Sequence, residues 1–306
     1  MDKKDITSFT SGEKAGRYMN PLTDFGFKKI FGEKDIMIAF LTDLLNPKVP
    51  IEDVIFIDKE LTEDEEEQRG VIYDLRCKSA DGSEFIVEMQ NKKQTNFSDR
   101  IIFYLSRAFS AQGKRKTEWD YKLSPVYGVF FLNFHLKGMK MQSVRTVQLR
   151  VDETGEVFSE KLKVFTLELP DYRDKPMEYP KTRLEYWLYN LANMETMETQ
   201  LPFQSQQPIF SKIGGLSELL NMSEEDRKKY YRSLDDYWTD ICVMESAVEE
   251  GFEKGMEKGM AMGIEKGKAM VEKNKKETAI KMKQCGFSME QIVLISGLSE
   301  EEIEKL

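Results

Sequence analysis

Residues 71–90 read VIYDLRCKSADGSEFIVEMQ, and this stretch predicts the centre of the fold. On both sides of Ala80-Asp81-Gly82 the residues alternate with a period of two, which is the pattern of β-strands. A three-residue connection that ends in glycine is typical of a β-hairpin, because glycine readily adopts the left-handed conformation that such a loop needs. We therefore expect two antiparallel strands joined by this loop.

The register of this hairpin places two acidic residues opposite each other. If Ser79 pairs with Ser83, then Asp74 lies directly across from Glu88, with their Cβ atoms about 4.5–5.5 Å apart on one face. Two negative charges at this distance repel unless a cation lies between them. Gln90, two positions beyond Glu88, shares the face. Because Mg²⁺ prefers oxygen ligands, the pattern predicts a site for a hard divalent cation.

The segments before the hairpin predict two helices and a strand. Residues 23–31 (TDFGFKKIF) have apolar residues at helical spacing, and Thr23 or Asp24 can cap the helix. A second helix is expected over 35–45 and a strand over 53–57. After the hairpin, further elements are expected as strands at 125–135, 144–151 and 162–168 and an aromatic-rich helix at 181–198.

A basic helix is predicted directly after the hairpin, over about 97–112. One face of this helix carries Arg100, Tyr104, Arg107 and Ala111. The surrounding stretch 92–116 has a net charge of +6, although the 306-residue chain has a formal net charge of −9. Its charged residues are Lys92, Lys93, Asp99, Arg100, Arg107, Lys114, Arg115 and Lys116. Cations at this place suit the binding of phosphate.

Composition excludes several classes of enzyme. The chain has one histidine, His135, which we expect to be a half-buried residue of the strand 125–135. A Ser-His-Asp or Cys-His arrangement, or any zinc site that contains histidine, would have to use this residue and is therefore disfavoured. The three cysteines, Cys77, Cys242 and Cys285, are too far apart for a C-x-x-C metal motif. The glycine-rich phosphate-binding motifs of Walker and Rossmann proteins are absent from the sequence.

Apolar patterning argues against a membrane protein. Hydrophobic residues form 40% of the chain, enough for a core, but no stretch approaches about 18 consecutive apolar residues. The first residues, MDKKDITSFTSGEKAGR, lack the apolar segment of a secretory signal. We therefore expect a cytoplasmic protein without contact to a membrane.

The chain resembles the PD-(D/E)XK nuclease family transposases, the recombination-promoting nuclease group of bacterial proteins. The resemblance lies in four segments that follow one another in this order: TDFGFKKIFG, VIYDLRC, FIVEMQ and FSDRIIFYLSRAFSAQ. The likeness spans about residues 18–306 and includes the later tail rich in Glu, Lys and Gly. It implies a restriction-endonuclease-like α/β core, in which helices flank a central mixed sheet, followed by a long helical region. It also implies cleavage of double-stranded DNA with Mg²⁺ or Mn²⁺ as the cofactor.

The resemblance assigns roles to individual residues. Asp74 and Glu88 match the two acidic metal ligands, and Gln90 stands at the catalytic position that is normally lysine. Asp24 matches an acidic residue that such nucleases often add to the catalytic site. The expected DNA- or phosphate-binding residues are Arg100 and Tyr104, which match residues of the following helix, together with Lys28 and Arg107.

Gln90 leaves two functions open. Lysine at this position would orient the attacking water and neutralise developing charge, whereas glutamine can only orient by hydrogen bonding. Members of this family often have glutamine there. The leading hypothesis is a metal-dependent DNA endonuclease of a transposase-like or recombination-promoting system. The alternative is a catalytically weak or inactive nuclease-like scaffold that binds DNA or protein.

The remaining sequence predicts the domain organisation. We expect a flexible arm over 1–17, the nuclease-like domain over 18–210, a long helical region over 211–274 and a small helix-turn-helix-like unit over 275–306. Within the helical region, glycines recur every four residues at Gly251, Gly255, Gly259, Gly263 and Gly267. Glycine destabilises a helix by about 0.5–1 kcal/mol relative to alanine, so the spacing indicates either close packing in a homodimer or a charged tether.

Overall fold

The computed structural model describes residues 16–47, 50–57, 60–61, 71–113, 122–136 and 142–306. The chain divides into two compact units, residues 1–240 and 241–306, and each is described by itself. Most of the predicted N-terminal arm and the triplet Lys114–Lys116 lie outside the described residues. In the described part, no helix is both long enough and apolar enough to cross a membrane.

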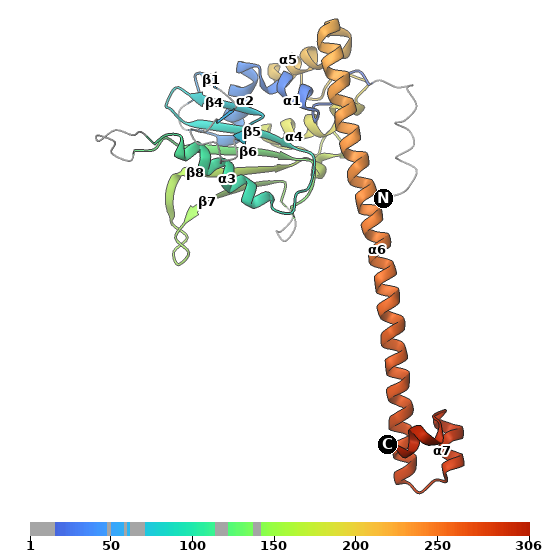
Figure 1. The fold of residues 1–306 in the computed structure, drawn as a ribbon. Coiled ribbons are helices and arrows are strands. Elements are labelled where there is room, and N and C mark those ends of the chain that lie inside the picture. The colour runs from blue at the N-terminus through green and yellow to red at the C-terminus, as the bar shows by residue number, and fades with distance from the viewer. Residues whose placement is uncertain (1–15, 48–49, 58–59, 62–70, 114–121, 137–141) are drawn as a thin grey trace. The chain divides into compact units, whose positions relative to one another are not determined.

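A six-stranded mixed sheet forms the centre of the first unit (Figure 1). Its strands, in spatial order, are β1 (Val54–Phe56), β4 (Leu75–Ser79), β5 (Glu84–Gln90), β6 (Val126–Leu132), β8 (Val157–Glu168) and β7 (Val144–Arg150). The central strands β5, β6 and β8 run parallel, and the outer pairings are antiparallel. A separate two-stranded sheet joins β2 (Glu60–Leu61) and β3 (Val71–Ile72). The predicted α/β architecture with a mixed sheet is confirmed.

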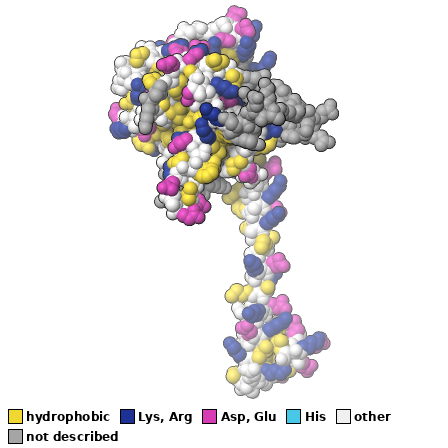
Figure 2. Space-filling view, turned by 90° about the vertical axis from the view of Figure 1, so that its left-hand side faces the viewer, with side chains coloured by type: hydrophobic (Ala, Val, Ile, Leu, Met, Phe, Trp, Pro, Cys, Tyr) yellow, Lys and Arg dark blue, Asp and Glu magenta, His cyan; other side chains and the backbone are white. Residues whose placement is uncertain are grey.

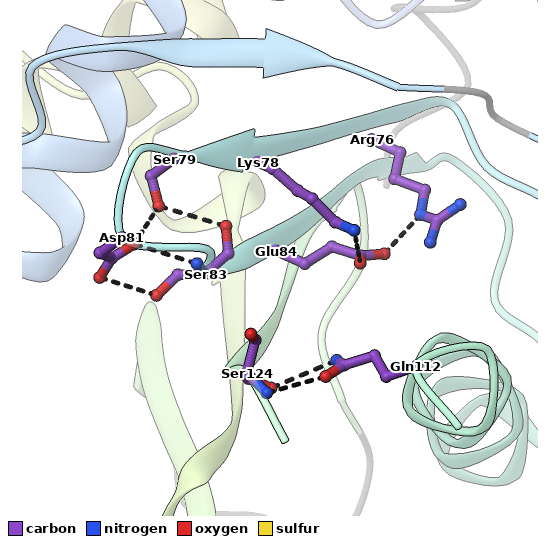
Figure 3. A network of polar contacts seen from close by, with 8 residues as sticks. All are labelled: Arg76, Lys78, Ser79, Asp81, Ser83, Glu84, Gln112 and Ser124. Atoms are coloured by element: carbon purple, nitrogen blue, oxygen red, sulfur yellow. Dashed lines mark hydrogen bonds and ion pairs between the residues drawn. The ribbon is translucent and has the colours of Figure 1, made fainter. Parts of the chain in front are cut away.

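The predicted hairpin register is confirmed in β4 and β5. Leu75 pairs with Val87 and Lys78 pairs with Glu84, as pairing of Ser79 with Ser83 requires. Gly82 has φ of 83°, the left-handed conformation expected of the loop. Figure 3 shows the loop closed by Asp81, whose carboxylate accepts hydrogen bonds from the backbone of Ser83 at 3.0 Å and from the side chains of Ser79 and Ser83.

One part of the hairpin prediction is wrong, because the first strand is not continuous. Alternation predicted a single strand through Asp74, but Val71–Ile72 pairs with β2, and Asp74 lies in a bend before β4. The side chains of Asp74 and Glu88 explain the break. The Asp74 N–H donates to Glu88 Oε1 at 3.2 Å, and the Met89 N–H donates to Asp74 Oδ2 at 2.9 Å. At this point, side-chain carboxylates accept the hydrogen bonds that backbone carbonyls would accept in a continuous pair of strands.

A buried ion pair crosses the hairpin on the face toward α3 (Phe97–Ser110). The guanidinium of Arg76 binds the carboxylate of Glu84, and Lys78 Nζ lies 3.6 Å from the second oxygen of that carboxylate (Figure 3). Beside them, Gln112 and Ser124 exchange two hydrogen bonds of 2.8 and 3.2 Å that join the segments after α3 and before β6. Because a buried charge is costly without its partner, this pair favours the observed register.

Helices cover both faces of the sheet. The helix α3 lies on one face of the sheet (Figure 1). Alternate residues of the strands, such as Ile86, Phe130 and Leu132, form the core between this face and α3. The other face carries the larger core, centred on Phe131, whose ring lies 5.1–5.6 Å from three phenylalanine rings of α1 and α2. The helices of this layer are α1 (Asp24–Phe31), α2 (Lys34–Leu45), α4 (Arg183–Asn193), α5 (Pro208–Ser217) and the first turns of α6 (Glu224–Gln284).

Two local features fix the start of α1. Thr23 caps the helix, as predicted, because its Oγ1 accepts from the Gly26 N–H at 3.0 Å. A Cβ atom at Gly26 would lie 2.2 Å from the carbonyl oxygen of Asn20, so only glycine fits. The Asn91 side chain, just after β5, donates to the carbonyl of Leu22 at 2.7 Å. This bond ties α1 to the end of the strand that carries Glu88.

The prediction that His135 belongs to a strand is wrong. The strand β6 ends at Leu132, the last residue that pairs with both β5 and β8. After it, the Asn133 N–H still donates to the Gln90 carbonyl at 2.9 Å, and the chain then bends. The apolar run continues past the point where both neighbouring strands end, so composition alone extends the strand too far. His135 therefore lies in the loop at the carboxyl edge of the parallel strands.

The second unit is helical. It contains the remainder of α6, then α7 (Met289–Ser296) and α8 (Glu300–Glu304), so short helices separated by turns follow α6, as expected for a helix-turn-helix-like unit. Ser288 and Ser299 cap the two short helices, and Gly286 and Gly297 adopt positive φ at the breaks. The small core of this unit consists of Ala279, Met282, Ile292, Leu298 and Ile303. The four-part domain division stays a prediction, and α5 and α6 run across its boundaries at 210 and 274.

Candidate active site

Asp74 and Glu88 meet at the carboxyl end of β5, on the face that α3 covers. The backbone N–H of Asp74 donates to Glu88 Oε1 at 3.2 Å, so the two acidic residues are direct neighbours, as the register predicted. The Glu88 side chain is buried, and that of Asp74 is only partly exposed. Among the described residues, Oδ1 of Asp74 accepts no hydrogen bond, since its bond from Met89 uses Oδ2. This oxygen is therefore available to a ligand.

Burial makes the charged forms of both carboxylates unfavourable. Removal from water raises the pKa of Glu88 to about 8, and the neighbouring charge of Asp74 adds to this effect. Burial also raises the pKa of Asp74, although the Met89 N–H and the positive charges of Lys28 and Arg100 act in the opposite direction. Two carboxylates that repel each other in a site of low polarity favour binding of either a proton or a metal cation.

Gln90 connects the acidic pair to the basic helix. Its Nε2 donates to Glu88 Oε2 at 2.9 Å, and its Oε1 accepts from Arg100 Nη1 at 3.3 Å. Arg100 Nη2 lies 3.7 Å from the same Glu88 oxygen, so the guanidinium also forms an ion pair with the acid. The amide thus uses both its donor and its acceptor, which a lysine at this position could not do.

The helix α1 brings Asp24 and Lys28 toward the pair. They form an ion pair one helical turn apart, and Asp24 is largely exposed. Both charges act on the pKa of Asp74, Lys28 lowering it and Asp24 raising it. The structure therefore places Lys28 within electrostatic reach of the acidic pair, with Asp24 at the solvent side.

Tyr104 supports Arg100 from the next turn of α3. The guanidinium carbon lies 4.9 Å from the centre of the Tyr104 ring, in the range of a cation–π contact. Tyr73, which directly precedes Asp74, donates its hydroxyl to the Tyr104 carbonyl at 3.0 Å. Arg107 follows one turn later and is partly buried. Tyr73 and Tyr104 thus connect α3 to the strand break at Asp74.

Sequence reasoning missed three residues that position this site. Gln94 accepts from Arg100 Nη1 at 3.1 Å, Asn91 ties α1 to β5, and Tyr73 reaches α3. Gln94 and Asn91 lie in an irregular segment between β5 and α3, where no periodicity indicates which way a side chain points. The polar composition of NKKQTN, directly after the second acidic residue, is the only signal that the sequence offers.

Asp74 and Glu88 fit a hard divalent cation. They supply carboxylate oxygens from neighbouring positions, and burial, the main cause of their raised pKa values, disfavours their charged forms unless a cation binds. The Gln90 amide lies beside them and can hydrogen-bond to a water molecule on such a cation.

Comparison with known protein families gives one match. The family model described as "PD-(D/E)XK nuclease family transposase" matches residues 21–247, about three quarters of the chain, and includes the hairpin, α1 and α3. Searches among curated proteins and among solved structures found no match. The match agrees with the mixed sheet and its flanking helices, which have the arrangement of a restriction-endonuclease-like core. The chain belongs to the PD-(D/E)XK nuclease family transposases.

Proposed function

We propose that this protein is a Mg²⁺- or Mn²⁺-dependent endonuclease that hydrolyses phosphodiester bonds of double-stranded DNA in a transposase-like or recombination-promoting system. The observation that carries the proposal is the pair of partly exposed Asp74 and buried Glu88, joined through Gln90 to Arg100. A metal held by the two carboxylates would lower the pKa of a bound water and neutralise charge on the scissile phosphate. Family membership supports DNA as the substrate.

The protein's own residues have distinct parts in this reaction. Gln90 orients the attacking water through its amide, because the amide already lies between Glu88 and Arg100. Arg100 has donors that can bind a non-bridging phosphate oxygen, and the Tyr104 ring holds its guanidinium in place. Lys28 adds positive charge near Asp74. Arg107 extends the basic face of α3 for contact with the DNA backbone.

A non-catalytic scaffold is the second candidate function, and Gln90 favours it. The usual lysine would add a positive charge at the reacting phosphate, and the amide adds none. In that case the same site would bind metal and DNA without turnover. Cleavage assays separate the two functions, because binding alone leaves supercoiled plasmid intact.

We expect the wild-type protein to nick supercoiled plasmid in the presence of Mg²⁺ or Mn²⁺. Asp74→Asn and Glu88→Gln should each lower the rate by roughly 10²–10³, the range for losing a positioned group that stabilises charge. Asp99→Asn, a change of an exposed acid in the first turn of α3, is the matched control and should leave the rate unchanged. A folded wild-type protein that nicks no plasmid with either metal would establish the scaffold function instead.

Stability should depend on pH in a way that metal reverses. A carboxyl whose pKa is raised by folding contributes stability while protonated, and this contribution is lost as the pH rises toward the folded-state value, about 8 for Glu88. The Tm of the metal-free protein should therefore fall between pH 5 and 8, as measured by calorimetry. Added Mg²⁺ should raise Tm increasingly with pH, since it binds the ionised pair.

Two variants check this pH dependence. Glu88→Gln should flatten the fall of Tm with pH and remove most of the metal effect, because the amide neither titrates nor binds Mg²⁺ strongly. Glu153→Gln, in the exposed turn between β7 and β8, is the control and should behave like wild type. A wild-type Tm that Mg²⁺, Mn²⁺ and Ca²⁺ all leave unchanged at pH 8 would show that the pair binds no metal.

Gln90 should be adapted to the neighbouring arginine. Gln90→Lys would bring a second cation against Arg100 and would remove the acceptor that Arg100 uses, so we expect cleavage to fall at least about 10-fold. Gln90→Ala should lower it by a similar factor. The double variant Gln90→Lys with Arg100→Gln exchanges the charge and the amide and should recover part of the rate. Faster cleavage by Gln90→Lys alone would mean that the missing charge limits the reaction.

We further propose that α6 joins two copies of the protein. The five glycines from Gly251 to Gly267 have nothing within 4 Å of an added Cβ atom, so their own unit does not require them. The residue after each of the first four glycines is a large, exposed apolar one, and Phe252 and Met260 are each about 70% exposed. Figure 2 shows such apolar side chains interspersed with charged ones along this helix. The glycines and the apolar residues that follow them each repeat every four residues along the helix. The apolar side chains of one copy can therefore pack into the shallow groove that the glycines leave on another copy.

The oligomeric state in solution tests this pairing. Met260→Glu should convert a dimer to a monomer in sedimentation velocity experiments. Ala261→Glu, one residue later and about 100° around the helix, is the matched control and should remain dimeric. Gly255→Ala with Gly259→Ala should strengthen the helix and yet weaken the dimer by crowding the contact. A wild-type monomer at all concentrations would instead indicate a tether.

A further inference from the structure

A second group of metal-ligating side chains lies at the carboxyl ends of β6 and β8. His135 follows β6, Glu168 ends β8, and Asp171 belongs to the short 3₁₀ helix η1 (Leu169–Tyr172). The Nδ1 atom of His135 lies 2.8 Å from Glu168 Oε2 and 3.8 Å from Asp171 Oδ1. One ligand atom from each residue lies within 4.8 Å of the other two.

Glu168 is held so that one oxygen points into this group. Its side chain is 1% exposed, and its Oε1 accepts from the guanidinium of Arg145 and from the Leu136 N–H at 3.2 Å. The second oxygen, Oε2, is the one that contacts His135. The ammonium of Lys93 donates to the His135 carbonyl at 3.1 Å and fixes the loop. Hydrogen bonds of this kind orient ligands in metal sites.

One ring nitrogen, Nδ1 of His135, lies near carboxylate oxygens of both Glu168 and Asp171. Among the described residues, the guanidinium of Arg145 contacts Oε1 of Glu168, whereas the contact with His135 uses Oε2. A metal ion could therefore take one ligand atom from each of the three side chains without breaking the contact of Glu168 with Arg145.

We propose that His135, Glu168 and Asp171 form a second divalent-metal site that takes Zn²⁺ in preference to Mg²⁺. Tetrahedral ligands about 2.0–2.2 Å from zinc lie roughly 3.3–3.6 Å from one another, and small side-chain rotations bring the three ligand atoms to that spacing. A histidine nitrogen in the ligand set favours Zn²⁺, because imidazole is a common zinc ligand and Mg²⁺ prefers oxygen ligands. His135, with 48% of its side chain exposed, leaves a fourth position open to solvent.

This site is separate from the Asp74–Glu88 pair. Gln90 pairs with Leu132, and Leu132 pairs with Glu168, so two strand spacings, about 9.6 Å, separate the backbones of Gln90 and Glu168. Metal ions that act together on one phosphate lie only about 3.5–4 Å apart. Both sites lie at the carboxyl ends of the parallel strands, but each one has its own ligands, so a metal can occupy one without the other.

The chain has a single histidine, so its imidazole nitrogens report directly on this site. We would label the full-length protein with ¹⁵N-histidine and titrate it with Zn²⁺ at pH 7.5. The Nδ1 signal should shift and saturate near one equivalent, while Nε2 keeps its proton. The exposed thiols of Cys242 and Cys285 also bind zinc, so the histidine signal and not the total bound zinc is the measurement.

Three variants make the titration decisive. Asp74→Asn with Glu88→Gln should keep the full response, whereas Asp171→Asn should weaken it at least 10-fold with an unchanged circular dichroism spectrum. Asp174→Asn, a nearby acid outside the group, is the matched control and should respond like wild type. An absent response in wild type, an equal response in Asp171→Asn, or a response lost with the Asp74 and Glu88 changes would each overturn the proposal. These outcomes are independent of whether the protein cleaves DNA.

Discussion

Two carboxylates, Asp74 and Glu88, face each other where the sheet and α3 exclude most of the water, and their repulsion constrains everything around them. Each charge costs more in this place than in solvent, which is why both pKa values rise. The protein offsets part of this cost with backbone N–H groups from Asp74 and Met89 and with the guanidinium of Arg100. The first hairpin strand breaks at Asp74 to supply these bonds, so the irregularity belongs to the site.

Four separate elements must be held in place for this arrangement to exist. The hairpin loop closed by Asp81 sets the register of β4 and β5, and the Arg76–Glu84 pair favours that register from inside the core. The helix α1 is tied to β5 through Asn91, and α3 is tied to the strand break through Tyr73. The geometry of the acidic pair therefore depends on contacts outside the pair itself, and loss of one of them would misplace Lys28 or Arg100.

The elements with strong periodicity could be predicted from the sequence, and so could the pairing of Asp74 with Glu88. With a period of two and a loop that ends at Gly82, a single register keeps the apolar residues of both strands on one face and the polar residues on the other. The structure has this register. The strand break at Asp74 and the loop position of His135 could not be predicted, because both depend on side chains or strand ends far away in the sequence. Glu168 meets His135 only because β6 and β8 are parallel neighbours that end together, and no local pattern contains that information.

The basic residues near the candidate site are already paired with acidic residues of the protein. The chain is acidic overall, and three of its basic residues near the site, Lys28, Lys92 and Arg100, form ion pairs with acids of the protein. Cations that are already paired attract phosphate weakly, so this surface differs from a general basic patch. On the proposed function, Asp74 and Glu88 would hold a metal ion that balances the charge of Glu88 in place of Arg100. The guanidinium of Arg100 would then be available to a phosphate oxygen, and binding of metal and binding of DNA would strengthen each other.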